Sequence, residues 1–222
     1  MLSPTLSIVL LAGSALASPL SHQLKRQTCP SIHIFGARET TASPGYGSAG
    51  QLVDNIISSN PGATSEAIDY PASGDNPSYA ESRQTGVSAV NSQVAAFAEQ
   101  CPDTKLVLVG YSQGAEIFDL ALCEGTSISQ YNIVAAIMFG APTFNAGASF
   151  DVGTCSAGGF DSSLAGTTCG SFESSIQSYC DSADPYCCTG SDANVHNGYE
   201  AEYGADALSF VNSKLASAPS MC

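Results

Sequence analysis

The feature that most constrains the fold of this chain is a five-residue segment, Gly-Tyr-Ser-Gln-Gly, at residues 110–114. It directly follows an apolar run at residues 106–109 and leads into a helix-compatible stretch at residues 115–123. Glycines flank Ser112 because a sharp turn from a strand into a helix brings neighbouring backbone too close for a Cβ atom. Such a turn presents the serine hydroxyl at the carboxyl edge of a sheet, with a helix N-terminus beneath it. We therefore interpret Ser112 as a nucleophile.

The apolar pattern of the chain predicts a buried parallel sheet. Strands are expected at residues 32–35, 67–70, 106–109 and 133–139. The last two are continuous apolar runs, which are typical of strands covered by helices on both faces. Two segments have the spacing of a helix that buries one stripe: Val87, Val90, Val94 and Phe97, and then Leu208, Val211 and Leu215. This alternation of strands and helices predicts one α/β domain with a central, mostly parallel sheet.

Length, charge and cysteine content limit what such a domain does. A chain of 222 residues is enough for one domain with a sizeable core. Its net charge of −14 gives a surface that repels phosphate backbones and anionic lipid head groups, so neither nucleic acid nor a membrane is expected as a partner. Nine cysteines without paired Cys-x-x-Cys units indicate an oxidising compartment. We expect a monomer.

The N-terminal residues have the features of targeting segments. A short apolar run with Ala15 and Ala17 in the pattern of a cleavage site predicts a signal peptide at residues 1–17. The dibasic pair Lys25-Arg26 predicts a pro-peptide at residues 18–26, which leaves residues 27–222 as the catalytic domain. The mature protein is therefore expected to be secreted and extracellular. The region 147–197, rich in Gly, Ser and Cys, is interpreted as a disulfide-clamped functional loop.

A serine nucleophile needs a base, and the chain contains three histidines. His22 lies in the predicted pro-peptide, and His33 lies inside the first predicted strand, where a structural role is expected. His196 follows the cysteine-rich region, and only this histidine fits the Ser, Asp, His order of α/β hydrolases. We interpret His196 as the base.

The acid that orients the base should lie between Ser112 and His196, on a rigid loop. Asp181 and Asp184 both stand between Cys180 and Cys187, which close a small loop if they pair. The other aspartates after the fourth predicted strand are Asp151, Asp161 and Asp192. Spacing alone does not separate Asp184 from Asp181.

Four segments together give the chain a family resemblance: residues 29–47, 110–114, 179–188 and 196–199. They resemble the fungal acetylxylan esterases of the cutinase-like carbohydrate esterase family, and the resemblance extends over about residues 28–215. It implies an α/β-hydrolase fold with Ser112 as nucleophile, His196 as base and Asp184 as acid. It also implies an oxyanion hole formed by the backbone N–H of Gln113 together with Thr40. Two such donors stabilise the oxygen that becomes negative in the tetrahedral intermediate.

The same resemblance implies a disulfide pattern that the sequence alone does not determine. Eight cysteines allow 105 pairings. The implied pairs are Cys29–Cys101, Cys123–Cys169, Cys155–Cys188 and Cys180–Cys187. Cys222 is left over at the C-terminus.

The resemblance covers two substrate classes, an acetylated polysaccharide such as xylan and the long-chain polyesters of cutinases. The mostly polar segment 191–198 around His196, with Val195 as its only sizeable aliphatic residue, favours acetyl removal from a polysaccharide. Candidate faces for stacking on sugars are Tyr46, Tyr79, Tyr111 and Tyr199.

Two other classes of function are weaker. A non-catalytic binding or elicitor protein on a hydrolase scaffold is disfavoured, because Ser112, Asp184 and His196 are all present. A zinc hydrolase is disfavoured because only His33 and His196 remain after residue 26, at distant positions and without a His-Glu-x-x-His motif. We expect no cofactor and no metal.

Overall fold

The computed structural model describes residues 28–124 and 127–218. The predicted signal peptide, the pro-peptide and Cys222 lie outside these residues. The described strands form one six-stranded sheet in the order β2-β1-β3-β4-β6-β5, and every neighbouring pair is parallel. The strands are β1 (Ile32–Ala37), β2 (Thr64–Ala67), β3 (Lys105–Tyr111), β4 (Ile133–Phe139), β5 (Asp151–Val152) and β6 (Ile176–Tyr179).

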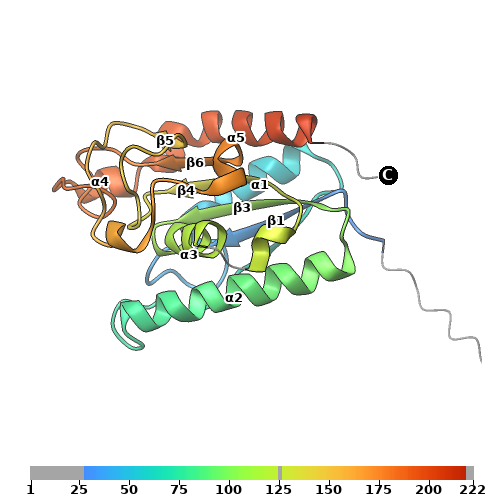
Figure 1. Ribbon diagram of the computed structural model, residues 1–222, viewed down its shortest axis with the longest axis horizontal. Helices are drawn as coiled ribbons and strands as arrows, with labels where there is room; N and C mark the ends of the chain where they lie inside the picture. Colours follow the sequence, from blue (N-terminus) through green and yellow to red (C-terminus); the bar gives the residue numbers. More distant parts are fainter. Residues whose placement is uncertain (1–27, 125–126, 219–222) are drawn as a thin grey trace, which may run out of the picture.

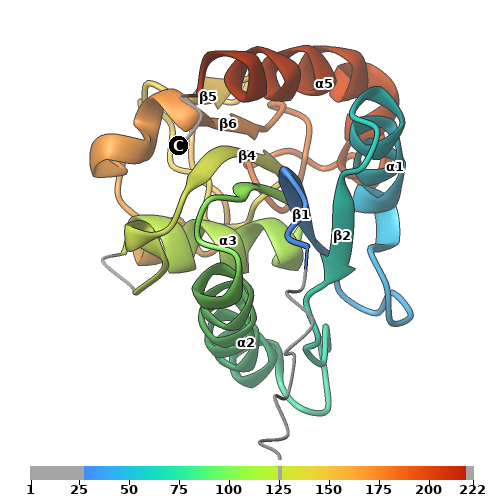
Figure 2. The same ribbon diagram turned by 90° about the vertical axis from the view of Figure 1, so that its right-hand side faces the viewer.

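Helices cover both faces of the sheet, as Figures 1 and 2 show. The helices α2 and α3 lie on one face, and α1 and α5 lie on the other. The α-helices are α1 (Gly50–Ser59), α2 (Tyr79–Gln100), α3 (Gln113–Cys123), α4 (Ala193–His196) and α5 (Tyr199–Ser217). Short 3-10 helices are η1 (Gly47–Ala49), η2 (Ser127–Gln130), η3 (Ser162–Leu164) and η4 (Gly170–Ser175). This arrangement confirms the predicted α/β fold.

The sequence placed the two central strands correctly and the second strand incorrectly. β3 and β4 are buried along nearly their whole length, as their continuous apolar runs predicted. The strand predicted at residues 67–70 is instead β2, Thr64–Ala67, an edge strand of mostly polar residues paired only with β1. Ile68 and Tyr70 are buried beyond its end, so the apolar pattern there marks packing and not pairing.

The region 147–197 is more ordered than the predicted loop. It contains β5, η3, η4, β6 and α4, and it gathers at the carboxyl end of the sheet, at the left of Figure 1. β5 and β6 extend the sheet beyond β4. The sequence did not predict these two strands, because both are short. β5 has two residues and β6 has four, and each strand contains a single aliphatic side chain.

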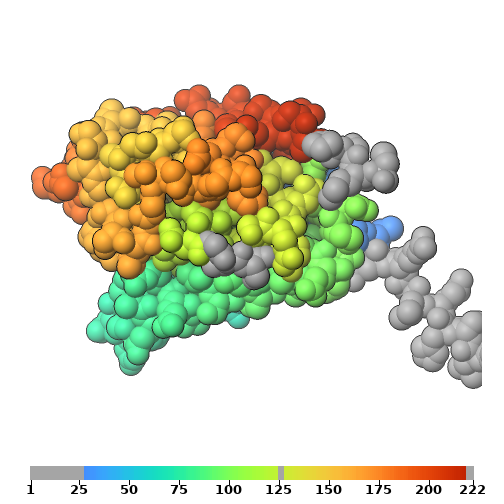
Figure 3. All heavy atoms as spheres, in the orientation of Figure 1, coloured from blue at the N-terminus to red at the C-terminus, as the bar shows by residue number. Residues whose placement is uncertain are grey.

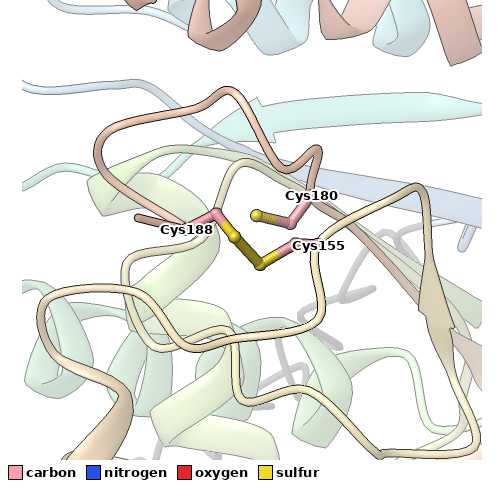
Figure 4. Close-up of side chains that lie close together, drawn as sticks. All are labelled: Cys155, Cys180 and Cys188. Carbon is pink, nitrogen blue, oxygen red and sulfur yellow. A yellow bond between two sulfur atoms is a disulfide. The ribbon is translucent and has the colours of Figure 1, made fainter. Parts of the chain in front are cut away.

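Four disulfides join the described part of the chain. They are Cys29–Cys101, Cys123–Cys169, Cys155–Cys188 and Cys180–Cys187, the same pairs that the resemblance implies. The sulfur atoms of Cys155, Cys180 and Cys188 lie within 4.8 Å of one another (Figure 4). All three sulfur atoms are bonded within disulfides, and a disulfide sulfur is not the thiolate that binds metals.

A buried acid in α3, Asp119, makes the free energy of unfolding depend on pH. Burial raises the pKa of Asp119 to about 7, whereas an aspartate in an unfolded chain titrates near 4. Between these values the unfolded chain has lost the proton that the folded protein still holds, so the free energy of unfolding falls as pH rises. Asp119→Asn should flatten this fall between about pH 4 and pH 7, measured by urea unfolding.

The exposed Asp54→Asn on α1 is the matched control and should keep the pH dependence of the wild type. Equal slopes for Asp119→Asn and the wild type over this range would contradict the prediction.

Candidate active site

Ser112 lies on a strained turn between β3 and α3. Its φ of +52° is in the left-handed region, which costs free energy for any residue other than glycine. A Cβ at Gly110 would lie 2.6 Å from backbone atoms of Gly114 and Ala115, and one at Gly114 would lie 2.2 Å from the carbonyl oxygen of Ala37. Both flanking glycines are therefore needed for the turn to close against α3 and β1, as the sequence motif predicted.

His196 connects Ser112 to Asp184. The imidazole Nε2 lies 2.9 Å from Oγ of Ser112, and Nδ1 lies 2.7 Å from Oδ2 of Asp184. All three side chains are buried, with Asp184 completely so. Three segments supply them: the β3–α3 turn, and then, more than 70 residues later, the loop after β6 and the end of α4, which are 12 residues apart. The distances fit a serine whose proton passes to a histidine that a carboxylate orients.

The carboxylate of Asp184 is held by four donors. Its Oδ1 accepts hydrogen bonds from the backbone N–H groups of Tyr186 (2.6 Å) and Cys187 (3.2 Å), and its Oδ2 accepts one from the hydroxyl of Tyr199 (2.8 Å). Burial alone would raise the pKa of Asp184, but these bonds and His196 hold the pKa below its ordinary value. Asp184 therefore stays ionised beside the imidazole.

The other candidate acids lie elsewhere. Asp181 accepts hydrogen bonds from the backbone and hydroxyl of Thr154 at 2.9 and 2.7 Å, and also from the hydroxyl of Tyr203. Asp151 caps backbone N–H groups at residues 147 and 148, and Asp161 pairs with an arginine. Asp192 is the N-cap of α4. Geometry thus brings only Asp184, among the described aspartates, to the histidine.

His33, the alternative histidine, lies in β1 away from this site. Its ring stacks on Phe97 with centroids 3.8 Å apart, and its Nδ1 lies 2.7 Å from the hydroxyl of Thr64. Burial lowers the pKa of His33 to about 4, so the ring is neutral and packs as a core aromatic group.

Two of the four tyrosines expected to stack on sugars have other positions, and this expectation was wrong for them. Tyr111 and Tyr199 are fully buried. The hydroxyl of Tyr111 donates to the carbonyl of His196 at 2.6 Å, and the hydroxyl of Tyr199 donates to Asp184. These two hydroxyls hold His196 and Asp184 in position. Sequence does not distinguish such a tyrosine from an exposed one, because both are amphipathic.

Tyr46 is also not a face of the pocket. Its ring packs over Gly36, and its hydroxyl lies 2.8 Å from that of Ser65. Two of the four tyrosines, Tyr79 and Tyr111, line the pocket at Ser112, and Tyr111 is almost completely buried there.

The loop after β1 brings Thr40 to the pocket. Arg38 is buried and donates from its guanidinium to the carbonyls of Ala42 (3.0 Å), Ile68 and Tyr70, which ties the loop to the segment beyond β2. Thr41 has a φ of +67° and donates its backbone N–H to Ala72 at 2.7 Å. The loop thus starts beside the first turn of α3, since a Cβ at Gly114 would lie 2.6 Å from the carbonyl oxygen of Arg38.

The pocket beside Ser112 has a volume of about 380 Å³ and a largely aromatic wall. Phe160 and Tyr186 line it together with Tyr79, Thr40 and His196. The polar surroundings expected from residues 191–198 are therefore only part of the site, because the aromatic side chains come from other segments. Nothing in the sequence near Phe160 indicated its place in the pocket.

Comparison with known proteins agrees with this fold and site. The family model described as Cutinase matches residues 28–215. Acetylxylan esterase 2 of Talaromyces purpureogenus is 52% identical over 225 residues, covering 93% of this chain and 96% of its own length. Cutinase 11 of Verticillium dahliae is 49% identical over 230 residues, covering 95% and 77%. A solved acetylxylan esterase structure is 52% identical, with a TM-score of 0.80, covering 85% of this chain and 100% of its own.

The fold and the serine turn define an α/β hydrolase of the cutinase-like type. The chain belongs to the Cutinase family. It is a carboxylic ester hydrolase, the class of its acetylxylan esterase and cutinase relatives.

The Cys180–Cys187 disulfide closes the loop that carries Asp184, which leads to a prediction about activity. Cys180→Ala/Cys187→Ala removes a bridge across 7 residues, and should cost about 2–3 kcal/mol of stability by the loop-entropy relation. Because Asp184 loses its rigid loop, kcat on p-nitrophenyl acetate should fall about tenfold to 100-fold at temperatures where the variant is folded.

The matched control is Cys29→Ala/Cys101→Ala, which opens a bridge across 72 residues at the opposite, amino end of the sheet. This change should cost more stability, about 4 kcal/mol, but leave kcat near that of the wild type. If kcat fell in step with stability in both variants, the small loop would not be a clamp for the acid.

Proposed function

We propose that this protein is a secreted serine esterase that removes O-acetyl groups from xylan through a Ser112–His196–Asp184 triad. The observation that carries the proposal is the position of His196, whose two nitrogen atoms reach Ser112 and Asp184 at 2.9 and 2.7 Å. The four disulfides support an extracellular location, because such bonds persist in oxidising compartments.

In the proposed reaction, Oγ of Ser112 attacks the acetyl carbonyl carbon while Nε2 of His196 takes the hydroxyl proton. The carbonyl oxygen becomes an oxyanion, and the backbone N–H of Gln113 with Thr40 is proposed to donate hydrogen bonds to it. The imidazolium then gives its proton to the departing sugar oxygen. The sugar leaves as an alcohol, and the acetyl group remains bound to Ser112 as an acetyl-enzyme. Water, deprotonated by Nε2 of His196, attacks the acetyl carbonyl carbon, and the imidazolium then returns that proton to Oγ of Ser112 as acetate leaves.

Ionised Asp184 is proposed to hold the imidazole in the tautomer that has its proton on Nδ1. Its negative charge then stabilises the imidazolium that forms during each half of the reaction. The lowered pKa of Asp184 supports this role, since the carboxylate does not take the proton itself.

Substrate class is the finer part of the proposal. Two acetylxylan esterases, from Talaromyces purpureogenus and Hypocrea jecorina, are 52% and 50% identical to this chain. The alternative, a cutinase-type esterase for longer chains, is favoured by the aromatic wall and by Cutinase 11 at 49% identity.

Substitution at the triad tests the mechanism. Ser112→Ala should abolish labelling by a fluorophosphonate probe and leave only residual hydrolysis of p-nitrophenyl acetate, because no other activated hydroxyl replaces the nucleophile. Asp184→Asn should lower kcat by roughly 10⁴-fold, because the amide no longer holds the imidazole tautomer.

Asp181→Asn is the matched control for the acid, since it lies in the same disulfide loop but binds Thr154 and Tyr203. This change should lower the free energy of unfolding but leave kcat close to that of the wild type. A larger loss of kcat in Asp181→Asn than in Asp184→Asn would overturn the assignment of the acid.

Acyl length separates the two candidate substrates. Each methylene that an apolar groove buries adds about 0.8 kcal/mol of binding, whereas the mostly polar segment 191–198 around His196 offers little apolar surface to bury it. We expect kcat/KM on p-nitrophenyl esters to be greatest for acetate, to fall at butyrate and to be very low from octanoate onward. A maximum at butyrate or longer, with clearing of a polyester suspension, would identify a cutinase-type activity.

A further inference from the structure

Large apolar side chains are exposed at three positions in the part of the chain that the structure describes: Phe160, Leu164 and Tyr186. Phe160 is 55% exposed and Tyr186 is 42% exposed, yet both line the pocket at Ser112. Exposed aromatic surface at a pocket, in a protein whose other described aromatic side chains are buried or half-buried, indicates a surface that a ligand covers.

The two exposed rings line the same pocket as Tyr79. The Tyr186 ring lies 4.5 Å from that of His196, the backbone N–H of Phe160 donates to the carbonyl of Tyr186 at 3.1 Å, and the Phe160 ring meets Tyr79 edge-on at 5.5 Å. Figure 3 shows the yellow-to-orange surface of this region against the blue-green start of α2, where Tyr79 is the first residue. The aromatic wall, Tyr186, Phe160 and Tyr79, thus runs outward from the base.

The far end of the aromatic wall is anchored from inside the protein by a buried acid. The hydroxyl of Tyr79 donates to Glu116, a completely buried residue of α3 one helical turn after Ser112. Arg83, one turn along α2 from Tyr79, reaches Glu116 at 3.3 Å and Asp161 at 2.5 Å.

Asp161 follows Phe160 directly, so this ionic network also fixes the segment that carries the Phe160 ring. A buried carboxylate is costly unless it is paired and hydrogen-bonded. Glu116 has both kinds of partner, and the two partners are the ring at the wall and the arginine that holds its neighbour.

The chemistry of ester cleavage indicates that the aromatic wall lies on the side of the pocket that holds the leaving alcohol. The leaving alcohol must lie close to Nε2 of His196, which returns the proton to it. The wall begins at Tyr186, in contact with the imidazole, and so it extends along the path of the alcohol. A pyranose ring has apolar C–H faces and polar edges, and an aromatic ring covers such a face while leaving the edges in water.

We propose that Tyr79 and Phe160 form the platform for the sugar ring that carries the acetyl group, and that Glu116, Arg83 and Asp161 are positioning residues for that platform. This inference rests on the proposed function and specifies its alcohol side. It gives the exposed Phe160, and the buried acid below the pocket, a role that the catalytic triad does not explain.

The test compares two acetate esters that differ only in the alcohol: an acetylated xylo-oligosaccharide and ethyl acetate. Phe160→Ala should lower the ratio of their kcat/KM values, oligosaccharide to ethyl acetate, by roughly threefold to tenfold, the worth of one aromatic contact. The loss should come mainly through KM. Phe160→Tyr, which keeps an aromatic face, should retain most of the ratio.

Leu164→Ala is the matched control, because Leu164 is exposed in η3, four residues along the same segment, but does not line the pocket at Ser112. Its ratio should equal that of the wild type. An unchanged ratio in Phe160→Ala would overturn the inference, as would a changed preference for acyl length with the ratio intact, because the wall would then contact the acyl group.

The positioning role is tested by coupling. Arg83→Met should lower the same ratio, and the double variant Arg83→Met/Phe160→Ala should lose little more than Phe160→Ala alone, since both changes remove one platform. Arg83→Lys, which keeps a cation between Glu116 and Asp161, should retain part of the ratio. If the ratio in the double variant fell by the product of the two single fold-changes, the two residues would act independently, which would contradict the positioning role.

These outcomes are distinct from failure of the proposed function. If the wild type released no acetate from the oligosaccharide while hydrolysing ethyl acetate, the proposed substrate would be wrong. If the wild type released acetate and Phe160→Ala did so with the same ratio, only the platform would be wrong.

Discussion

The close approach of α3 to the end of β1 is the constraint on which the rest of the site depends. It requires glycine at both ends of the serine turn, since a Cβ at Gly114 would lie 2.2 Å from the carbonyl oxygen of Ala37. The same approach holds Ser112 at a φ of +52°, a strained conformation that surrounding packing must maintain. It also sets the loop after β1, with Thr40, next to the start of α3. Ser112 and the candidate oxyanion donors are thus fixed by one contact between two backbones.

His196 and Asp184, in contrast, come from segments with little regular structure, and they are held by buried tyrosines and disulfides. Tyr111 extends from the end of β3 to the carbonyl of His196, and Tyr199 extends from the start of α5 to the carboxylate of Asp184. The Cys180–Cys187 bridge closes the acid's loop. Rigid hydrogen-bonded supports of this kind are needed because catalytic distances tolerate only small errors, and a loop alone does not supply that precision.

The sequence predicted the parts of this structure that local patterns encode. Continuous apolar runs located β3 and β4, and the glycine-flanked serine located the turn between β3 and α3. The short, polar β2 and the two-residue β5 carry no such pattern, because their pairing depends on neighbouring strands. The role of each tyrosine likewise depends on its burial in the folded protein, which the local sequence does not show. Tyr79 faces the pocket while Tyr199 supports the acid, and nothing in their flanking residues separates these two environments.

Asp181 and Asp184 illustrate how environment, and not residue type, divides the work between two carboxylates three residues apart. Both accept several hydrogen bonds, but the partners of Asp181 are Thr154 and Tyr203, which join the loop to neighbouring segments. The partners of Asp184 include the imidazole, so the charge that the fold stabilises is directed at the base. The same distinction applies to Glu116, a third acid close to Ser112 in sequence. Burial raises the pKa of Glu116 to about 8, and its carboxyl group contacts Tyr79 and Arg83, away from the imidazole, whereas that of Asp184 contacts His196.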